Sequence, residues 1–377
     1  MKHRKMSKSL GNGIDPLDVI ARFGADPLRY TVVAGMGLGV DIIFDPDDLE
    51  KSFAPGRNFV TKLWNIGRFL LTNVGTDPVA SLHDIAASRL TRADRWILGR
   101  LNAAIATCDT ALGPARPGNA TWTDGERVAG LRLNEYTEAA RGFAWGELAD
   151  WYLESVKSRL TTPGEDREVA RAVLVYSFDQ VLRLLQPIVP FVTDALWQRL
   201  PNTEAALAVA PWPTWYTISG ESNEFDLVIE AVNAIRRLRA DYSVPPGKPV
   251  TCTVVPSSGA ATLFREESGL AGRLARADIT VATAVPSEAS AHAVLSDGTQ
   301  VVLSLAGVVD VDRECARLKS ELASLEKQLE SLRGRLQNEN FLARAKPDVV
   351  EAERQKEVEW SSRRELLADK VRSLCGG

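Results

Sequence analysis

Residues 5–12 read KMSKSLGN, and residues 13–20 continue as GIDPLDVI. Lys5 and Lys8 bracket two uncharged residues, and a glycine follows at position 11, which predicts a short loop with two cationic side chains. Ammonium groups on flexible stems can follow negative charge as it develops on a polyphosphate leaving group. For a lone pair of lysines, a solvated basic N-terminus is the competing interpretation. The two lysines by themselves do not decide between these interpretations.

Composition bounds the class of protein. The chain has 377 residues, which is long for one domain and fits roughly two to four. It carries a net charge of −4, so any nucleic-acid binding has to come from local basic patches. The sequence shows no secretory leader and no apolar run of membrane-spanning length, and we expect a cytoplasmic protein without membrane contact.

Cysteines and histidines are sparse and scattered. No C-x-x-C occurs, so we expect neither a disulfide framework nor a structural zinc site, and a reducing compartment fits this usage. The three histidines lie too far apart in sequence for a metal cluster, and no metal site is predicted. The four cysteines are Cys108, Cys252, Cys315 and Cys375.

Helix signals dominate the first 215 residues. Asp15 before Pro16 predicts the N-cap of a helix that ends at Gly24. Asp26 before Pro27 predicts the N-cap of a second helix. Apolar periodicity then predicts a helical bundle, and its tryptophans are interpreted as core residues. The periodic segments are 59–70, 96–108, 143–156 and 173–185.

The pattern changes from about residue 224. A helix is predicted over 227–240 with Arg236, Arg237 and Arg239 facing outward, followed by a Pro/Gly linker. Short strands and an Asp297-Gly298 hairpin turn indicate a small α+β module. The predicted strands are 250–255, 279–282, 293–295 and 300–305.

A leucine seam marks the last segment. Leucines spaced 4-3-4-3-4 predict a heptad helix, and Pro347 at a first helical position starts a second helix. An antiparallel hairpin within one chain buries the seam, whereas a dimerisation coiled coil is the alternative. The pattern alone leaves both open. The seam residues are Leu318, Leu322, Leu325, Leu329, Leu332 and Leu336.

Several blocks carry a family resemblance. KMSKSLGN with its IDP flank resembles the KMSKS signature of class I aminoacyl-tRNA synthetases. Three blocks resemble the anticodon-binding domain of the valine, isoleucine and leucine enzymes, and the segment after it is similar too. The tip and second arm of the predicted hairpin resemble the tRNA-binding arm of the valine-specific members. The blocks are 56–65, 150–154, 187–197, 235–239, 244–248, 338–342, 345–347 and 349–351.

The resemblance implies a mainly α chain in four parts. Only the tail end of the class I catalytic α/β domain is present, at 1–45. A helical-bundle anticodon-binding domain follows at 46–215, and a small α+β connecting module at 216–312. A tRNA-binding antiparallel coiled-coil arm covers 313–377. The arm favours the valine enzymes, since isoleucine enzymes end in a cysteine-rich zinc module; the corresponding part of an isoleucyl enzyme is the alternative.

The resemblance also implies a reaction. The valine-specific members join valine to its tRNA and consume ATP with Mg²⁺. A class I catalytic site also needs an HIGH-type motif. No H-x-G-H occurs in this sequence. We therefore expect a C-terminal piece of such a ligase that is inactive by itself. It is either one subunit of a split enzyme with a separate N-terminal half or part of an interrupted reading frame. A non-catalytic tRNA-binding module is the alternative, and the reading frame immediately upstream distinguishes the two.

Site residues follow by resemblance. Lys5 and Lys8 are the expected catalytic residues, and together with Ser7 and Ser9 they bind ATP. The expected partners are tRNA(Val), ATP and valine, and the chain is expected to be a monomer. Trp64 is a further candidate for RNA contact, but core packing is the favoured interpretation. Candidate tRNA contacts are Arg57, Asn58 and Lys62 in the bundle, and Arg333, Arg335, Phe341, Arg344 and Lys346 in the arm.

Overall fold

The computed structural model forms two compact units, Met1–Phe225 and Asp226–Gly377, and each is described by itself. In the part of the chain that the structure describes, no helix combines the length and the apolar character needed to cross a membrane. The described residues are 6, 13–37, 39–46, 48–75, 77–113, 132–201, 203, 205–218, 223–245, 247–286, 290–305, 307, 311–338 and 347–375.

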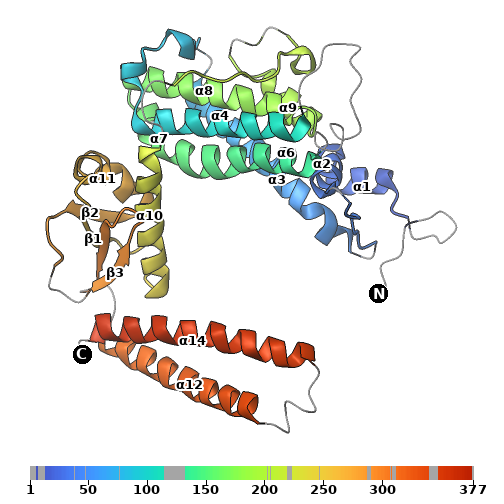
Figure 1. Ribbon diagram of the computed structural model, residues 1–377. Coiled ribbons are helices and arrows are strands. Elements are labelled where there is room, and N and C mark those ends of the chain that lie inside the picture. Colours follow the sequence, from blue (N-terminus) through green and yellow to red (C-terminus); the bar gives the residue numbers. More distant parts are fainter. Residues whose placement is uncertain are drawn as a thin grey trace. The chain divides into compact units, whose positions relative to one another are not determined.

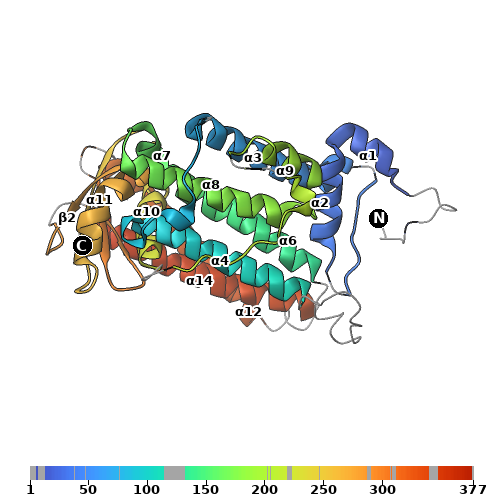
Figure 2. The ribbon, with the colours of Figure 1, turned by 90° about the horizontal axis from the view of Figure 1, so that it is seen from above.

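Helices build the first unit, as the periodicity predicted (Figure 1). Helix α8 contacts both α3 and α4, and it lies between them in the view from above (Figure 2). The helices are α1 (Pro16–Phe23), α2 (Ala25–Gly35), α3 (Leu49–Val74), α4 (Arg92–Leu112), α6 (Leu133–Gly142), α7 (Leu153–Thr161), α8 (Glu165–Leu185) and α9 (Pro190–Trp197). Short 3₁₀ turns occur at η2 (Leu82–Asp84), η3 (Ala87–Arg89) and η5 (Leu207–Val209).

Helix α1 begins and ends as the sequence predicts. The side chain of Asp15 accepts a hydrogen bond from the backbone N–H of Leu17 at 2.8 Å, and Pro16 occupies the first turn. Gly24 follows the helix with a φ of 101°, a conformation that other residues rarely adopt. The buried face of α1 packs on Phe53 of α3, so the helix behind the lysine loop is fixed to the bundle.

Asp26 does not cap its own helix, and that prediction is wrong. Helix α2 starts at Ala25, and Asp26 is 5% exposed in its first turn. Its carboxylate accepts hydrogen bonds from the backbone N–H groups of Phe191, at 3.3 Å, and Val192, at 2.7 Å. These two N–H groups belong to the first turn of α9, where no side chain of the cap residue serves as acceptor. Asp26 therefore caps a helix distant in sequence, and burial raises its pKa.

Close contact between α2 and α3 requires a glycine. A Cβ atom at Gly56 would lie 2.6 Å from the backbone carbonyl oxygen of Pro27, which is closer than real Cβ contacts. The absent side chain lets α3 cross directly on the backbone of α2. The N-terminal helices and the bundle consequently share one packed junction.

A π-helical stretch interrupts a helix that the periodicity predicts as regular. Residues Phe143–Tyr152, labelled η4, join α6 to α7 with wider turns. Phe143, Leu148 and Tyr152 point into the core and are 2% exposed or less. Such stretches are rare and occur mostly as single turns, frequently near functional positions.

The tryptophans divide between core and surface, which corrects the prediction that they are core residues. Trp96 and Trp197 are buried. Trp64 on α3 is 41% exposed, and Trp215, in the segment after η5, is 62% exposed. Trp64 lies on the outward face of α3, although its residue type favours core packing.

A four-stranded sheet with two covering helices starts the second unit. The strand order is β2-β1-β4-β3, with β1 and β2 parallel and the other pairs antiparallel. The parallel pair requires a crossover, which α11 supplies; the sequence prediction contained no helix there. The elements are α10 (Glu224–Asp241), β1 (Val250–Val255), α11 (Ala261–Ala275), β2 (Ala277–Val281), β3 (Ser290–Val294) and β4 (Gln300–Ser304).

Arg239 is buried, not outward-facing as predicted. It is 7% exposed, and its guanidinium donates to the backbone carbonyls of Arg276 at 2.7 Å, Pro245 at 3.0 Å and Lys248 at 2.9 Å. A guanidinium has five donors in a planar fork, so one side chain can fix several loop carbonyls at once. Periodicity alone assigns an arginine to the surface and misses this use.

Two long helices form an intramolecular hairpin. Helix α12 (Val311–Gln337) packs on α14 (Pro347–Cys375), which starts at the predicted proline (Figure 1). Leu318, Leu325, Leu329 and Leu332 of the predicted seam are buried. The expectation that the cysteines remain unpaired is wrong in one respect: Cys315 and Cys375 form a disulfide with Cα atoms 5.7 Å apart. Sequence spacing hides this pair because the hairpin brings together residues 60 positions apart.

Candidate nucleic-acid interface

The residues expected to bind ATP lie outside the described residues. These are Lys5, Ser7, Lys8 and Ser9. Met6 is the described residue within this segment, and it is 45% exposed. The structure does describe the elements that follow the loop, α1 and α2, and both contact α3. Helix α1, which follows this segment in the sequence, is therefore packed on the bundle.

Arg57 and Asn58 occupy neighbouring positions on α3 with different surroundings. The guanidinium of Arg57 donates to both carboxylate oxygens of Glu50, with one N–O distance of 3.1 Å. It also lies over the ring of Phe23, 5.7 Å from its centroid. Asn58 is exposed on the next face of the helix. Arg57 is thus held by its own helix and by α1, whereas the amide of Asn58 faces solvent.

Lys62 takes part in a cluster that joins α3 to the π-helical stretch. Its ammonium group lies 2.8 Å from a carboxylate oxygen of Asp150 and 5.3 Å from the ring centroid of Trp145. Arg141 approaches the same ring at 5.5 Å. Phe59 stacks near Trp145, with centroids 6.5 Å apart and planes at 12°. A tryptophan beside two cations is chemically suited to stack a nucleobase and to attract its phosphate.

The exposed face of α3 is a second polar surface. Helical spacing places its residues on one side, and Trp64 adds an aromatic ring 41% exposed. Amide groups and an exposed ring are the groups with which proteins read splayed bases of single-stranded loops. The face comprises Asn58, Thr61, Trp64, Asn65 and Arg68.

The arginines of the arm connect its two helices. Arg333 donates to Glu357 at 2.8 Å and to the hydroxyl of Ser361 at 3.0 Å. Arg335 forms an ion pair with Glu353 at 3.1 Å. Each of the two arginine side chains is 52% exposed, so phosphate contact remains sterically accessible. The other arm candidates, Phe341, Arg344 and Lys346, lie outside the described residues.

Sequence reasoning missed Trp145 and Arg141. Both residues lie in or beside a segment whose apolar periodicity favours core packing. The cluster also needs Lys62, which belongs to a different helix, α3. The signal available in the sequence was the aromatic density of residues 143–152, which read FAWGELADWY. Only the packing of α3 on η4 indicates which of those aromatic side chains meets cations.

Comparison with known families matches three parts of the chain. Residues 1–45 match the family described as tRNA synthetases class I (I, L, M and V). Residues 126–255 match the anticodon-binding domain of tRNA ligase. Residues 310–375 match the valyl tRNA synthetase tRNA binding arm. The three matches follow one another along the sequence without overlap.

Individual relatives match almost the whole chain. The valine–tRNA ligase of Geobacillus kaustophilus (strain HTA426) is 34% identical over 377 residues, covering 98% of this chain and 40% of the relative. That of Carboxydothermus hydrogenoformans is 36% identical over 381 residues, with the same coverage. The chain thus spans about two fifths of the length of these curated relatives.

One solved structure is similar at low level. The crystal structure of the Agrobacterium radiobacter K84 LeuRS–tRNA–LeuAMS ternary complex is 20% identical, and the match covers 56% of this chain and 23% of that chain. The TM-score is 0.40, which is too low to support an argument.

Proposed function

The chain belongs to the class I tRNA ligases and corresponds to the C-terminal part of valine–tRNA ligase, and from this we propose that it supplies the KMSKS loop and the tRNA-recognition domains of that enzyme. The observation that carries the proposal is the order of the three matches: catalytic-domain end, anticodon-binding domain and valine-specific arm. In this proposal each matched part has a different role, and all three act on the same tRNA.

The proposed reaction proceeds in two steps. A valine carboxylate oxygen attacks the α-phosphorus of ATP, the bond to pyrophosphate breaks, and valyl-adenylate forms. A terminal ribose hydroxyl of the tRNA then attacks the valyl carbonyl, and AMP leaves. Lys5 and Lys8 would hold the β- and γ-phosphates, with Ser7 and Ser9 shaping the loop, because the barrier lies in charge moving onto pyrophosphate. Mg²⁺ enters as part of Mg-ATP and neutralises phosphate charge.

RNA recognition divides between two surfaces in this proposal. The exposed face of α3 and the Lys62–Trp145 cluster offer amide groups and rings for splayed anticodon bases. The arm presents cations suited to phosphates of the tRNA outer corner, including Arg333 and Arg335. The match of the arm to that of valyl tRNA synthetases supports tRNA(Val) as the partner in this proposal.

The complete site needs groups that this sequence does not contain. No H-x-G-H occurs in the 377 residues, so adenine and valine selection falls to a separate N-terminal half. We propose a monomeric, cytoplasmic chain whose arm is an antiparallel coiled coil and which lacks activation activity alone. The absent motif also favours the second candidate, a tRNA-binding module without catalysis.

One experiment separates the two candidates. Valine-dependent ATP–pyrophosphate exchange and tRNA charging are measured for the chain alone and together with an HIGH-containing half from a valine enzyme. Exchange at background alone and clear activity with the added half supports the ligase. Tight binding of tRNA(Val) without activity in either arrangement supports the binding module. Charging of tRNA(Ile) in preference to tRNA(Val) by the reconstituted enzyme would overturn the assignment, because this chain supplies the tRNA-recognition domains. Light scattering of the same sample reports whether the chain is monomeric.

A further inference from the structure

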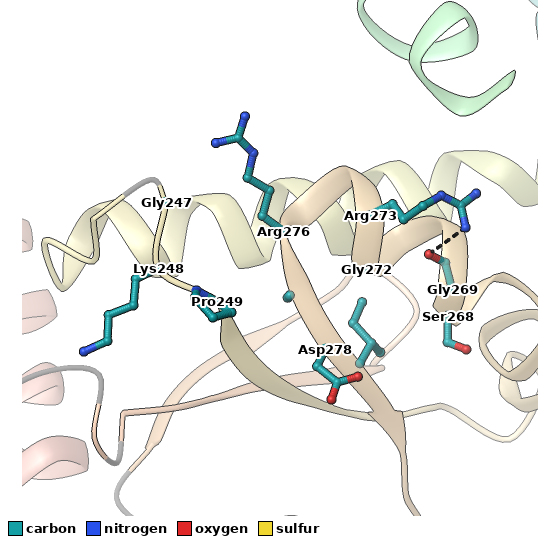
Figure 3. A pocket seen from close by; sticks show the side chains of 11 residues that line it. Gly247, Lys248, Pro249, Ser268, Gly269, Gly272, Arg273, Arg276 and Asp278 are labelled. Atoms are coloured by element: carbon teal, nitrogen blue, oxygen red, sulfur yellow. Dashed lines mark hydrogen bonds between the residues drawn. The ribbon is translucent and has the colours of Figure 1, made fainter. Parts of the chain in front are cut away.

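A groove in the second unit is lined by basic side chains and a glycine floor (Figure 3). It has a volume of about 500 Å³ and lies where α11 ends and β2 begins. Lys248, Arg273 and Arg276 contribute the cations, and Asp278 contributes a carboxylate. We call it the basic groove. Lys248 lies near the end of the stretch that matches the anticodon-binding domain, whereas Arg273, Arg276 and Asp278 lie outside all three family matches.

Strand pairing brings the cations to one edge of the sheet. Strands β1 and β2 are parallel, with Val250 opposite Ala277. The residues just before each strand therefore lie at the same edge, which places Lys248 beside Arg276. Arg276 has a φ of 53° and turns the chain from α11 into β2, and Arg273 lies one helical turn before it. The fold itself thus assembles the groove.

The floor of the groove is backbone. A Cβ atom at Gly272 would lie 2.6 Å from the carbonyl oxygen of Ala277, so only glycine allows α11 to lie directly on the start of β2. Gly269 adds a second position without a side chain, and its carbonyl accepts from Arg273 at 3.3 Å. The close packing of α11 on β2 therefore fixes the backbone from which Arg273 and Arg276 project.

Two arginines of α10 offset the negative end of α11. The last carbonyls of a helix carry partial negative charge, which would disfavour an anion. Arg236 donates to the carbonyl of Leu274 at 2.9 Å, and Arg239 donates to that of Arg276 at 2.7 Å. These contacts satisfy the helix end from one side. The exposed side chains of Arg273 and Arg276 then add positive charge on the groove side.

The cations are spread along the groove and do not converge. Figure 3 shows the side chains of Lys248, Arg273 and Arg276 extending in different directions from the rim. Lys248 donates to the carbonyl of Gly307 at 2.7 Å and is partly exposed, and the side chains of Arg273 and Arg276 are exposed to solvent. Cations that converge suit a single ion, whereas cations that are spread suit a chain of phosphates.

We propose that the basic groove binds the phosphodiester backbone of RNA. It is open, and the described residues that line it include no aromatic ring, so a stacked base or an apolar small molecule fits poorly. Arginine and lysine are the residues with which proteins hold nucleic-acid phosphates. The inference rests on the proposed function, which supplies tRNA as the partner, and it adds a third contact to the bundle and the arm.

The test compares variants of the full chain in tRNA binding. The double variant Arg273→Gln/Arg276→Asn removes two cations, and asparagine tolerates the left-handed backbone at position 276. Arg265→Gln is the matched control, because Arg265 is an exposed arginine of α11 outside the groove. Filter binding of valine and non-valine tRNA transcripts is measured over a range of salt concentrations, with circular dichroism as the folding check.

We expect the affinity for tRNA to fall when cations of the groove are removed and to rise when its carboxylate is removed. The double variant should lose roughly three- to tenfold in affinity for all tRNAs alike, and its salt slope should fall by about one to two. Arg265→Gln should match the parent chain. Asp278→Asn should bind tRNA more tightly, a gain that structural damage does not produce. Replacing chloride by inorganic phosphate at equal ionic strength should leave binding unchanged.

Each other outcome counts against the groove. If the parent binds tRNA and the double variant and Asp278→Asn both match it, the groove makes no RNA contact, while the proposed function stands. Displacement of RNA by inorganic phosphate would indicate a single-ion site and overturn the extended-backbone assignment. If the parent chain binds no tRNA, the proposed function is wrong, and the proposal that the groove binds RNA is wrong as well. Should the double variant misfold, the Asp278→Asn measurement decides.

Discussion

The carboxylate of Asp26 accepts a hydrogen bond from the backbone N–H of Val192 at 2.7 Å and so joins α2 to the first turn of α9. Arg29 extends the junction by donating to the carbonyls of Ile188 at 3.1 Å and Pro187 at 2.9 Å. Asp26 lies in the part that matches the class I synthetases, and Val192 lies in the part that matches the anticodon-binding domain. Helix α2 is therefore held by hydrogen bonds to the part of the bundle that matches the anticodon-binding domain.

Replacing Asp26 by alanine should destabilise the first unit. Two backbone N–H groups at the start of α9 would lose their acceptor, and an unsatisfied buried donor costs about 1–3 kcal/mol. Urea unfolding followed by circular dichroism measures the loss. Asp18→Ala, at an exposed position of α1, is the control and should change stability little. Equal effects of the two substitutions would mean that the junction with α9 contributes nothing.

Arg159 should be more important for stability than a surface arginine. Its guanidinium pairs with the buried carboxylate of Asp94 at 2.8 Å, and the hydroxyl of Tyr152 donates to the same carboxylate at 2.7 Å. Arg159→Met would leave Asp94 charged and uncompensated, at a cost of about 3–5 kcal/mol. Tyr152→Phe removes one hydrogen bond to the carboxylate and should cost about 1.5–3 kcal/mol.

The control for this pair is Arg68→Met, since Arg68 is exposed on α3. Chemical denaturation of the three variants should rank Arg159→Met as the least stable and leave Arg68→Met close to the parent. If the denaturant midpoint of Arg159→Met equals that of the parent chain, the buried ion pair adds no net stability. Replacement of buried ion pairs by apolar residues is neutral in some proteins.

Local signals predicted element ends wherever the cap and the helix are adjacent. Asp15 with Pro16 and the proline at position 347 started helices as predicted, and the Asp297-Gly298 turn joined two strands. These features depend on a few neighbouring residues, and tertiary packing does not override them.

Predictions failed where the partner was distant in sequence. Asp26 looked like a local cap, but its donors lie more than 160 positions away. Arg239 looked solvent-exposed, but loops that follow it supply carbonyls. The roles of Lys5 and Lys8 stay a prediction from the family resemblance. The basic groove could not be predicted, because its cations meet only after β1 and β2 pair.

The disulfide between Cys315 and Cys375 should restrain the base of the arm. It closes a loop with a sequence separation of 60, for which the chain-entropy model gives about 4 kcal/mol of stabilisation. Under non-reducing denaturation, alkylation should modify only Cys108 and Cys252, the two free cysteines. After reduction, all four should react, and limited proteolysis of the arm should become faster.

Cys375→Ser is the matched variant for this prediction. Without a partner, Cys315 should react with the alkylating reagent in unreduced protein, and proteolysis of the arm should no longer respond to reductant. If the parent chain purified in air already shows four reactive thiols, the pair does not form under those conditions, and the original expectation of unpaired cysteines would hold.

Lys8 should act on rate more than on structure. In the reconstituted enzyme, Lys8→Ala should lower the rate of valine activation roughly 10²-fold or more, as loss of one charge-stabilising donor does elsewhere. The Michaelis constant for valine should change little, because the lysine would act on pyrophosphate in the transition state. Rapid-quench measurement of adenylate formation checks this, and Lys2→Ala is the control. An unchanged rate constant would remove Lys8 from the mechanism.

Binding of tRNA should separate into an affinity part and a specificity part. Replacing Arg344 and Lys346 by alanine should weaken binding of all tRNAs alike and flatten the salt dependence, because phosphate contacts carry no sequence information. Replacing Asn58 on the exposed face of α3 should instead reduce the preference for the valine anticodon, since base edges carry specificity. Asn58 is the sharper test than Arg57 or Lys62, whose ion pairs also serve the fold.

Filter binding with tRNA(Val) and with the same transcript carrying a changed anticodon measures both parts at two salt concentrations. Thr72→Ala, at an exposed position near the other end of α3, serves as the control for helix substitutions. If the arm variant lost discrimination between the two transcripts while Asn58→Ala retained it, the two roles would be reversed. Base readout would then lie in the arm, and the bundle would supply the general affinity.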